Sequence, residues 1–145
     1  MSSLVAAFLL GIVAGLRTLT APAVLLLLRG GGWASYLLAV GALLEDAGDL
    51  NPKTPPRTAP VGLIARLLSG GFCGWWLTAP TGGSIAIGVL LGAGGALIGA
   101  YGGLTARRLA TSAIGRVPAA LLEDVVAIAA AVAIVTYAGR PIVTP

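Results

Sequence analysis

The chain has 145 residues, of which 57% are apolar and only 10% are charged, and its mean hydropathy is +0.98. Soluble domains carry about 25% charged residues, so this composition excludes a soluble enzyme and a disordered tail. The 22 glycines lie largely within apolar stretches, which is typical of closely packed membrane helices. The net charge of +4 includes no basic cluster interleaved with aromatic residues, so it indicates membrane orientation rather than nucleic-acid binding.

The first apolar stretch, residues 4–28, is long enough to cross about 30 Å of hydrocarbon as a helix. A signal peptide would carry basic residues before its apolar core, and nothing basic precedes Leu4. Apolar sequence resumes after Arg17 and Thr20. We therefore expect a retained membrane helix with an arginine inside it.

The remaining apolar segments differ in length. Residues 33–44 reach little more than half way across a bilayer as a helix, which predicts a re-entrant or interfacial helix. Prolines and charges indicate a solvent-facing loop over residues 45–60. The other predicted spans are residues 61–78, 85–104 and 121–137, with turns at 80–83 and 106–117. The predicted fold is all-α, a single polytopic membrane domain over residues 1–145 with four spans and this short helix.

Four spans place most of the basic residues on one side, and the positive-inside rule makes that side cytoplasmic. These residues are Arg29, Lys53, Arg57, Arg107, Arg108 and Arg116. Arg140 and both chain ends then lie outside. The abundance of alanine, glycine and arginine is typical of a bacterium with a GC-rich genome, so we expect the bacterial cytoplasmic membrane. If residues 33–44 also cross, the count becomes five, which the charge bias does not exclude.

Two segments resemble each other and suggest a tandem repeat of two-helix units. Residues 9–16 (LLGIVAGL) and 97–104 (LIGAYGGL) share two glycines and the flanking leucines. The first half of the repeat is residues 1–82 and the second half is residues 83–145. Residues 29–56 are then an insertion in the first half. In this alignment Arg66 takes the place of Asp124, so the two side chains can pair across the repeat axis.

Glycines spaced four residues apart place bare backbone on one helix face, where another helix can approach closely. The pairs are Gly11 with Gly15, Gly88 with Gly92, Gly95 with Gly99, and Gly99 with Gly103. This pattern predicts helix packing, either within the chain or between copies in a homo-oligomer. A solute passage lined by backbone is the alternative.

Arg17 lies well inside the first span, beside Thr18 and close to Pro22, which frees a backbone carbonyl. A charged residue at a helix centre costs about 2.5 to 3.5 kcal/mol, so it needs compensation. One interpretation is a structural arginine that pairs with a carboxylate or reaches the interface. The other is that Arg17 and Thr18 bind an anion or another substrate.

Glu45, Asp46 and Asp49 form an acidic cluster at the end of the short apolar segment. Three carboxylates suit a hard cation, although they can equally be solvated charges at the interface. The lack of histidine and of paired cysteines argues against zinc, haem or copper. The identity of a metal therefore stays open, and no cofactor is expected.

Glu123 and Asp124 enter the last predicted span soon after Pro118. Adjacent helical residues point about 100° apart, so at least one of the two carboxylates faces the interior of the bundle. That carboxylate can bind a cation or a proton, or it can compensate Arg17 or Arg66.

Lys53, Arg57 and Arg66 suit a lipid phosphate at the headgroup level. No catalytic residue is predicted, because the usual nucleophilic triads need a base and the chain has no histidine. The sequence also lacks a phosphate-cradling glycine loop followed by lysine.

Several short motifs together resemble a family of small bacterial membrane proteins described only as a domain of unknown function. They are Gly15-Leu16-Arg17-Thr18, Glu45 with Asp49, Pro56-Arg57, Arg66 and Glu123-Asp124. The likeness covers nearly the whole chain. It implies a compact helical membrane domain and no particular activity.

These residues support three hypotheses. The first is a homo-oligomer that binds and translocates a small ion or polar solute, with Arg17, Arg66, Glu123 and Asp124 lining the site and the acidic cluster at its cytoplasmic mouth. The second is a membrane enzyme acting on a lipid phosphate, held by the basic residues named above. The third is an accessory subunit that packs against a larger membrane protein.

Overall fold

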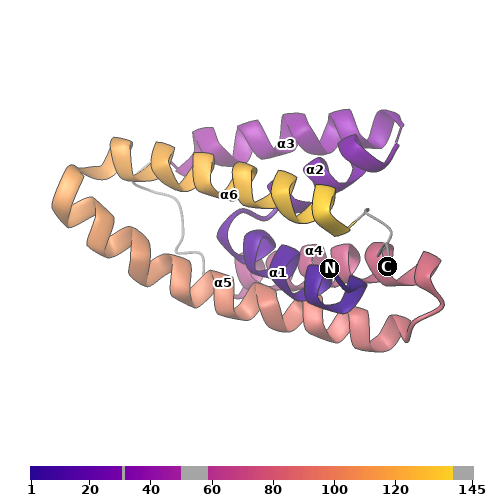
Figure 1. Cartoon of the computed structure of the whole chain (residues 1–145). Coiled ribbons are helices and arrows are strands. Elements are labelled where there is room, and N and C mark those ends of the chain that lie inside the picture. The colour runs from indigo at the N-terminus through magenta and orange to yellow at the C-terminus, as the bar shows by residue number, and fades with distance from the viewer. Residues whose placement is uncertain (31, 50–58, 139–145) are drawn as a thin grey trace.

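The computed structural model describes residues 1–30, 32–49 and 59–138, which are entirely helical apart from short connections (Figure 1). The helices are α1 (Ser3–Leu16), α2 (Thr20–Arg29), α3 (Trp33–Asp49), α4 (Pro60–Thr78), the short 3-10 helix η1 (Ala79–Thr81), α5 (Ile85–Ile114) and α6 (Arg116–Ala138). An all-α fold is therefore confirmed for the described residues.

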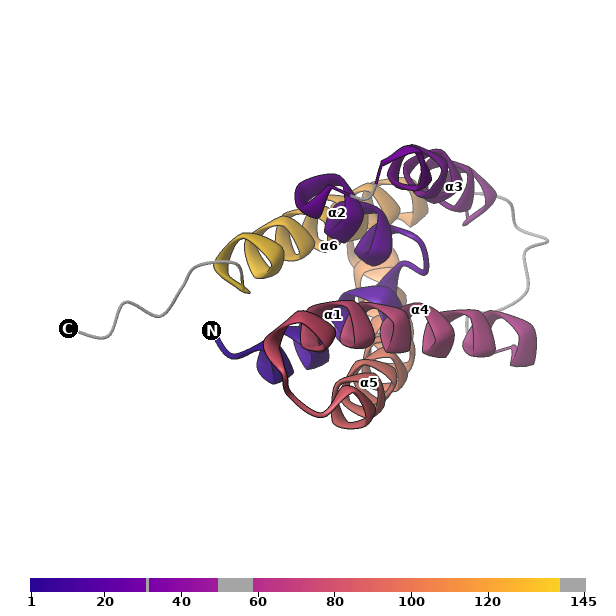
Figure 2. The ribbon, with the colours of Figure 1, turned by 90° about the vertical axis from the view of Figure 1, so that its right-hand side faces the viewer.

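The helices form two layers, which both ribbon views separate clearly (Figures 1 and 2). One layer contains α1, α4 and α5, and these three helices make the most extensive contacts with one another. The other contains α2, α3 and α6, in which α2 packs against both of its neighbours. The buried core between the layers is made mainly of small and aliphatic side chains from α1, α2, α4 and α6.

Glycines allow the first layer to pack with backbone against backbone. A Cβ atom on Gly11 would stand 2.9 Å from the Cα of Gly92, and one on Gly15 would stand 2.8 Å from the Cα of Gly99. On the other side of α5, a Cβ on Gly74 would stand 2.7 Å from the carbonyl carbon of Gly88. These glycine faces are therefore occupied by helices of the same chain.

The glycine contacts also give the helix directions. Gly11 and Gly15 face progressively later residues of α5, so α1 and α5 are parallel. α2 then turns back, because Arg29 at its end lines the same cavity as Ser3 at the start of α1. The two helices thus form a hairpin whose tip lies inside the bundle. We call the end at which α1 begins, on the right in Figure 1, the N-terminal end of the bundle.

The reversal corrects the expected single helix over residues 4–28, which breaks at Arg17. It also corrects the position of Arg29, which lies at the N-terminal end and not with the arginines of the α5–α6 connection. The predicted turn over residues 106–117 is wrong as well, because α5 continues to Ile114. The helix ends at Gly115, whose φ of 89° is readily adopted only by glycine.

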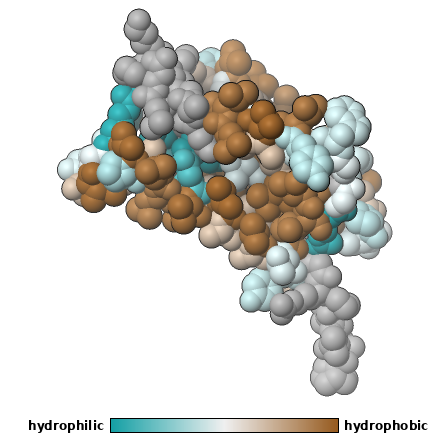
Figure 3. All heavy atoms as spheres, turned by 90° about the horizontal axis from the view of Figure 1, so that it is seen from above, coloured by the Kyte–Doolittle hydropathy of each residue, from teal (hydrophilic) through white to brown (hydrophobic). Residues whose placement is uncertain are grey.

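Three described helices are long and apolar enough to cross a membrane: Pro60–Thr81, Ile85–Ile114 and Arg116–Ala138. They correspond to three of the four predicted spans. Much of the face formed by α3 and α6 is apolar, as the brown surface in Figure 3 shows. Exposed side chains on these two helices include Leu37, Leu43, Val125 and Ile128, as expected for helices that contact lipid.

Candidate functional site

The hairpin tip is a helix break whose cause is local. Arg17 has an extended backbone, with φ −138° and ψ 114°, and ends α1. Pro22 lies in the first turn of α2, where a missing N–H is tolerated. The break exposes backbone N–H and C=O groups inside the bundle, where each needs a hydrogen-bond partner.

Glu45 of α3 satisfies the N–H groups at the start of α2. Its carboxylate accepts hydrogen bonds from the Thr18 N–H at 2.9 Å and from the Leu19 N–H at 3.0 Å. A negative charge at a helix N-terminus is also favoured by the helix dipole. Glu45 therefore links α3 to the hairpin tip in the manner of a capping residue.

Arg66 and Ser69 of α4 satisfy the carbonyl groups of the break. The Arg66 Nε donates to the Gly15 carbonyl at 3.2 Å, near the end of α1, and Nη1 donates to the Gly62 carbonyl at 3.0 Å. The Ser69 hydroxyl donates to the Thr18 carbonyl at 2.5 Å. In a continuous helix that carbonyl would accept from residue 22, and Pro22 has no N–H to give.

Two buried ion pairs flank the tip, and each joins one layer to the other. The Arg66 Nη2 lies 3.6 Å from the Glu45 Oε1, and Arg17 pairs with Asp124 of α6. Arg17 is the most buried of these side chains, with 1% of its surface exposed, whereas Asp124 retains 17%. Of the two partners left open for Asp124, Arg17 is the one it contacts, and the pairing of Arg66 with Asp124 suggested by the repeat is wrong.

A third ion pair lies toward the α5–α6 connection. The Arg107 Nη1 donates to the Glu123 Oε2 at 3.3 Å, and both side chains are mostly buried. Glu123 and Asp124 therefore face two different arginines, as their positions on adjacent residues of one helix allow.

We define the charged centre as the break at Arg17 and Thr18 together with the side chains that surround it, which are those of Arg17, Glu45, Arg66, Ser69 and Asp124. The fold thus gathers five of the ten predicted site residues, with Glu123 one residue away in the sequence. The side chains of Asp46 and Asp49, and the whole of Lys53 and Arg57, lie outside the described residues. Within the described part of the chain, no group of three acidic, histidine or cysteine residues could hold a metal ion.

Two residues around the centre were missed from the sequence. Ser69 follows Arg66 by three positions, which places both on one helix face, and this spacing could have identified it. Arg107 was assigned only to the basic side of the membrane, because the predicted turn over residues 106–117 separated it from Glu123. The continuation of α5 as a helix brings the two together.

Comparisons of the chain with protein-family models, curated proteins and solved structures find no match. Across its described residues, the fold and the centre define a helical protein with three helices able to cross a membrane and a charged helix break inside its bundle.

Proposed function

We propose that α3, α4, α5 and α6 cross the membrane and that the α1–α2 hairpin is re-entrant. The last three helices meet the length and hydropathy that a span requires. α3 has 17 residues, or about 25 Å as a helix, and carries exposed apolar side chains. This arrangement keeps four spans but changes which segments form them. Residues 4–28, predicted to be a span, form the re-entrant hairpin, and α3, predicted to be re-entrant or interfacial, is a span.

The arginines of the α5–α6 connection favour a cytoplasmic location for that end. Arg107, Arg108 and Arg116 lie there, and the positive-inside rule makes a cluster of this kind cytoplasmic. The N-terminal end of the bundle then faces the outside of a bacterial cytoplasmic membrane.

Within this arrangement, the protein binds and translocates a small ion or polar solute at the charged centre. The helix break with its buried charges carries the proposal. Interrupted helices near the middle of a membrane are a recurring feature of transporter binding sites, where half-helix ends contact the solute. Ionisable residues inside membranes are rare and mostly serve ion or substrate pathways.

The core blocks access to the charged centre from the N-terminal end of the bundle. Apolar side chains of the core, including Leu10, Leu25, Leu77 and Val135, fill the space between that end and the hairpin tip. On the side away from that end, the side chains of Glu45 and Asp124 retain 16% and 17% exposure, while the Asp124 Oδ1 itself is buried. These features support a state in which the outer path is sealed and the centre is partly accessible from elsewhere.

Solute flux into proteoliposomes tests the proposal. Vesicles with the purified protein are exposed to gradients of K⁺, Na⁺, chloride, acetate, inorganic phosphate, glycerol and urea, and swelling is followed by stopped-flow light scattering. We expect accelerated flux of at least one probe, and loss of that flux in Glu45→Gln. The matched control is Arg108→Gln, which removes an exposed charge that is not part of the centre.

Two results would overturn transport. Equal flux through empty and protein-containing vesicles for every probe would leave no translocated solute. Equal flux in the wild type and a folded Glu45→Gln variant would show that the centre is not used.

A further inference from the structure

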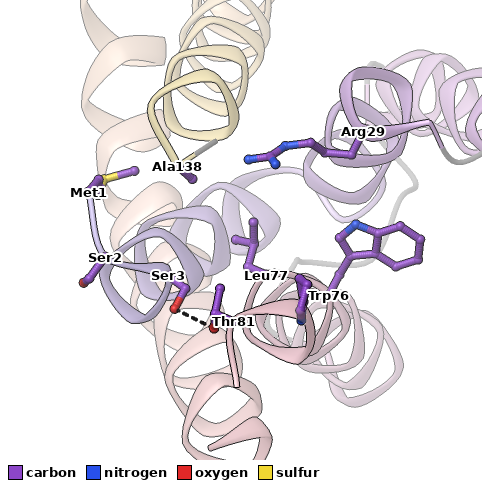
Figure 4. Close-up of a pocket in the computed structure, with 9 residues that line it drawn as sticks. Met1, Ser2, Ser3, Arg29, Trp76, Leu77, Thr81 and Ala138 are labelled. Carbon is purple, nitrogen blue, oxygen red and sulfur yellow. Dashed lines mark hydrogen bonds between the residues drawn. The ribbon is translucent and has the colours of Figure 1, made fainter. Parts of the chain in front are cut away.

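A cavity of about 510 Å³ lies at the N-terminal end of the bundle, apart from the charged centre. The start of α1 and the ends of α2, α4 and α6 surround it (Figure 4). Its volume is within the range of small-molecule sites, about 300 to 1,000 Å³. The cavity is therefore large enough for a polar headgroup or a free small anion.

Arg29 supplies the charge in this cavity. In Figure 4 its side chain extends from α2 toward the end of α6, where the Nη2 donates to the Val135 carbonyl at 3.1 Å. A guanidinium has five N–H donors, and that bond uses one of them. Its planar arrangement of donors matches the oxygen atoms of phosphate and carboxylate groups.

The rest of the cavity is lined by polar side chains on one side and apolar side chains on another. The hydroxyls of Ser3 and Thr81 lie 3.3 Å apart on one side of the cavity, and the Thr81 hydroxyl donates to the Thr78 carbonyl at 2.8 Å. The Trp76 and Leu77 side chains line another side. This combination suits a ligand with an anionic oxygen head and an apolar body, and it also accommodates the head alone.

The described lining contains a guanidinium and hydroxyl groups but no carboxylate. A cation would meet the positive charge of Arg29 without an acidic side chain among these residues to offset it. An oxyanion would find a charged donor beside hydroxyl groups that can turn toward it, and charge-assisted hydrogen bonds are the stronger kind.

We infer that this cavity is a binding site for a phosphate oxyanion, with Arg29 as its principal ligand and with Thr81 as a second donor once its hydroxyl turns from the Thr78 carbonyl to the ligand. The phosphate can belong to a phospholipid headgroup, since the site lies at an end of the apolar helices, or to a soluble anion. The site does not depend on the proposed transport, because its lining residues are separate from the charged centre.

The first arm of the test uses inorganic phosphate. Replacing Trp33 and Trp75 with Phe leaves Trp76 as the reporter of the cavity, and its fluorescence is followed in maltoside detergent at constant ionic strength. We expect a saturable change, with affinity about tenfold weaker in Arg29→Gln. Arg29→Lys should lose less, Thr81→Val should lose severalfold, and Arg108→Gln should match the wild type.

The second arm uses lipid. Protein extracted from nanodiscs of phosphatidylcholine and phosphatidylglycerol is examined by native mass spectrometry. Retention of one phosphatidylglycerol that is lost in Arg29→Gln but kept in Arg108→Gln assigns the site to a lipid headgroup. Phosphate binding without lipid retention assigns it to a soluble anion.

Because Thr81→Val leaves Arg29 in place, it tests the site even if Arg29→Gln fails to fold. The inference is overturned if no Arg29- or Thr81-dependent binding occurs in either arm. Saturable binding of choline or K⁺ that strengthens in Arg29→Gln would overturn it as well.

Discussion

Arg17 carries a full positive charge into the interior of the bundle, with only 1% of its side chain exposed. Pairing with Asp124 lowers the resulting electrostatic penalty, because an isolated buried charge is far more costly than a paired one. The pair joins the hairpin tip to α6. The contribution of this pair to stability can therefore be measured separately from any role in binding a solute.

We expect Arg17→Met to lower the free energy of unfolding by about 3 to 5 kcal/mol, because it leaves Asp124 buried without its counter-charge. The double variant Arg17→Met, Asp124→Leu should recover most of that loss, since a well-packed apolar pair can replace a buried ion pair. Reversible unfolding of both variants in detergent measures the difference. A double variant as unstable as the single one would contradict this account of the pair.

Glu45 gives a second prediction at this scale. Glu45→Gln keeps one acceptor oxygen but replaces the other with a donor, so one of the Thr18 and Leu19 N–H groups loses its acceptor. Exchange of these amide hydrogens should accelerate about tenfold, as expected for the loss of about 1.4 kcal/mol. Glu123→Gln is the matched control and should leave both amides protected. Unchanged exchange in Glu45→Gln would show that the carboxylate does not cap α2.

The sequence identifies which charges matter but not how they pair. Arg17, Glu45 and Asp124 stand out because each interrupts or borders an apolar stretch. Their partners depend on the reversal at the hairpin tip, which brings α3 beside Thr18 and α6 beside Arg17. The positions of the charges in the sequence do not give that geometry, so they left both Arg17 and Arg66 open as partners of Asp124.

At the scale of the helices, close packing in the first layer depends on glycine more than on side-chain fit. A Cβ on Gly99 would stand 2.9 Å from the Ile12 carbonyl carbon, and backbone cannot move away as a flexible side chain can. Gly94 lies on the same helix but faces open space. Leaving aside the adjacent turns of α5, a Cβ on Gly94 would have no neighbour within 4 Å among the described residues. The two positions form a matched pair for mutation.

We expect Gly99→Ala to destabilise the fold by about 1 to 3 kcal/mol through overpacking against α1. Gly94→Ala should cause no loss, because the added methyl group meets open space and alanine favours a helix over glycine. Thermal unfolding of the two variants in the same detergent provides the comparison. Equal stability would mean that α1 and α5 are not in close contact.

Apolar length predicts α4, α5 and α6, but it does not report the direction of a helix. For residues 4–28, length alone favoured a continuous span, although Arg17 and Pro22 both marked the position of the break. At the end of α5 the error is reversed, because a turn was predicted where the helix continues. Arg107 and Arg108 suggested a turn, yet charged residues can continue a helix beyond its apolar part, and α5 ends only at Gly115.

For the whole molecule, the hairpin places the described start of α1 and the end of α6 at the same end of the bundle. The four crossings proposed for α3 to α6 agree with that arrangement. If α1 and α2 together formed another span, there would be five crossings, and the two ends would lie on opposite sides of the membrane. The glycine faces of α1, α4 and α5 are occupied within the chain. A homo-oligomer, which remains a prediction, would have to use other surfaces.

Cysteine labelling in intact cells tests the orientation. Cys73, which is buried, is replaced with Ala, and a single cysteine is introduced as Ser84→Cys or Ser112→Cys at exposed positions near the two ends of α5. A membrane-impermeant maleimide should label Ser84→Cys directly and Ser112→Cys only after permeabilisation. The reverse pattern would place the arginines of the α5–α6 connection outside.

Exchange of the two charges of the buried pair tests the central claim most directly, because it separates a structural role from solute binding. The variant Arg17→Asp, Asp124→Arg keeps an ion pair but reverses its direction across the hairpin tip. We predict stability closer to the wild type than that of either single variant, together with loss of flux for the probe that the wild-type protein transports. Recovery of both stability and wild-type flux would contradict the account, because the pair would then serve only to hold the fold.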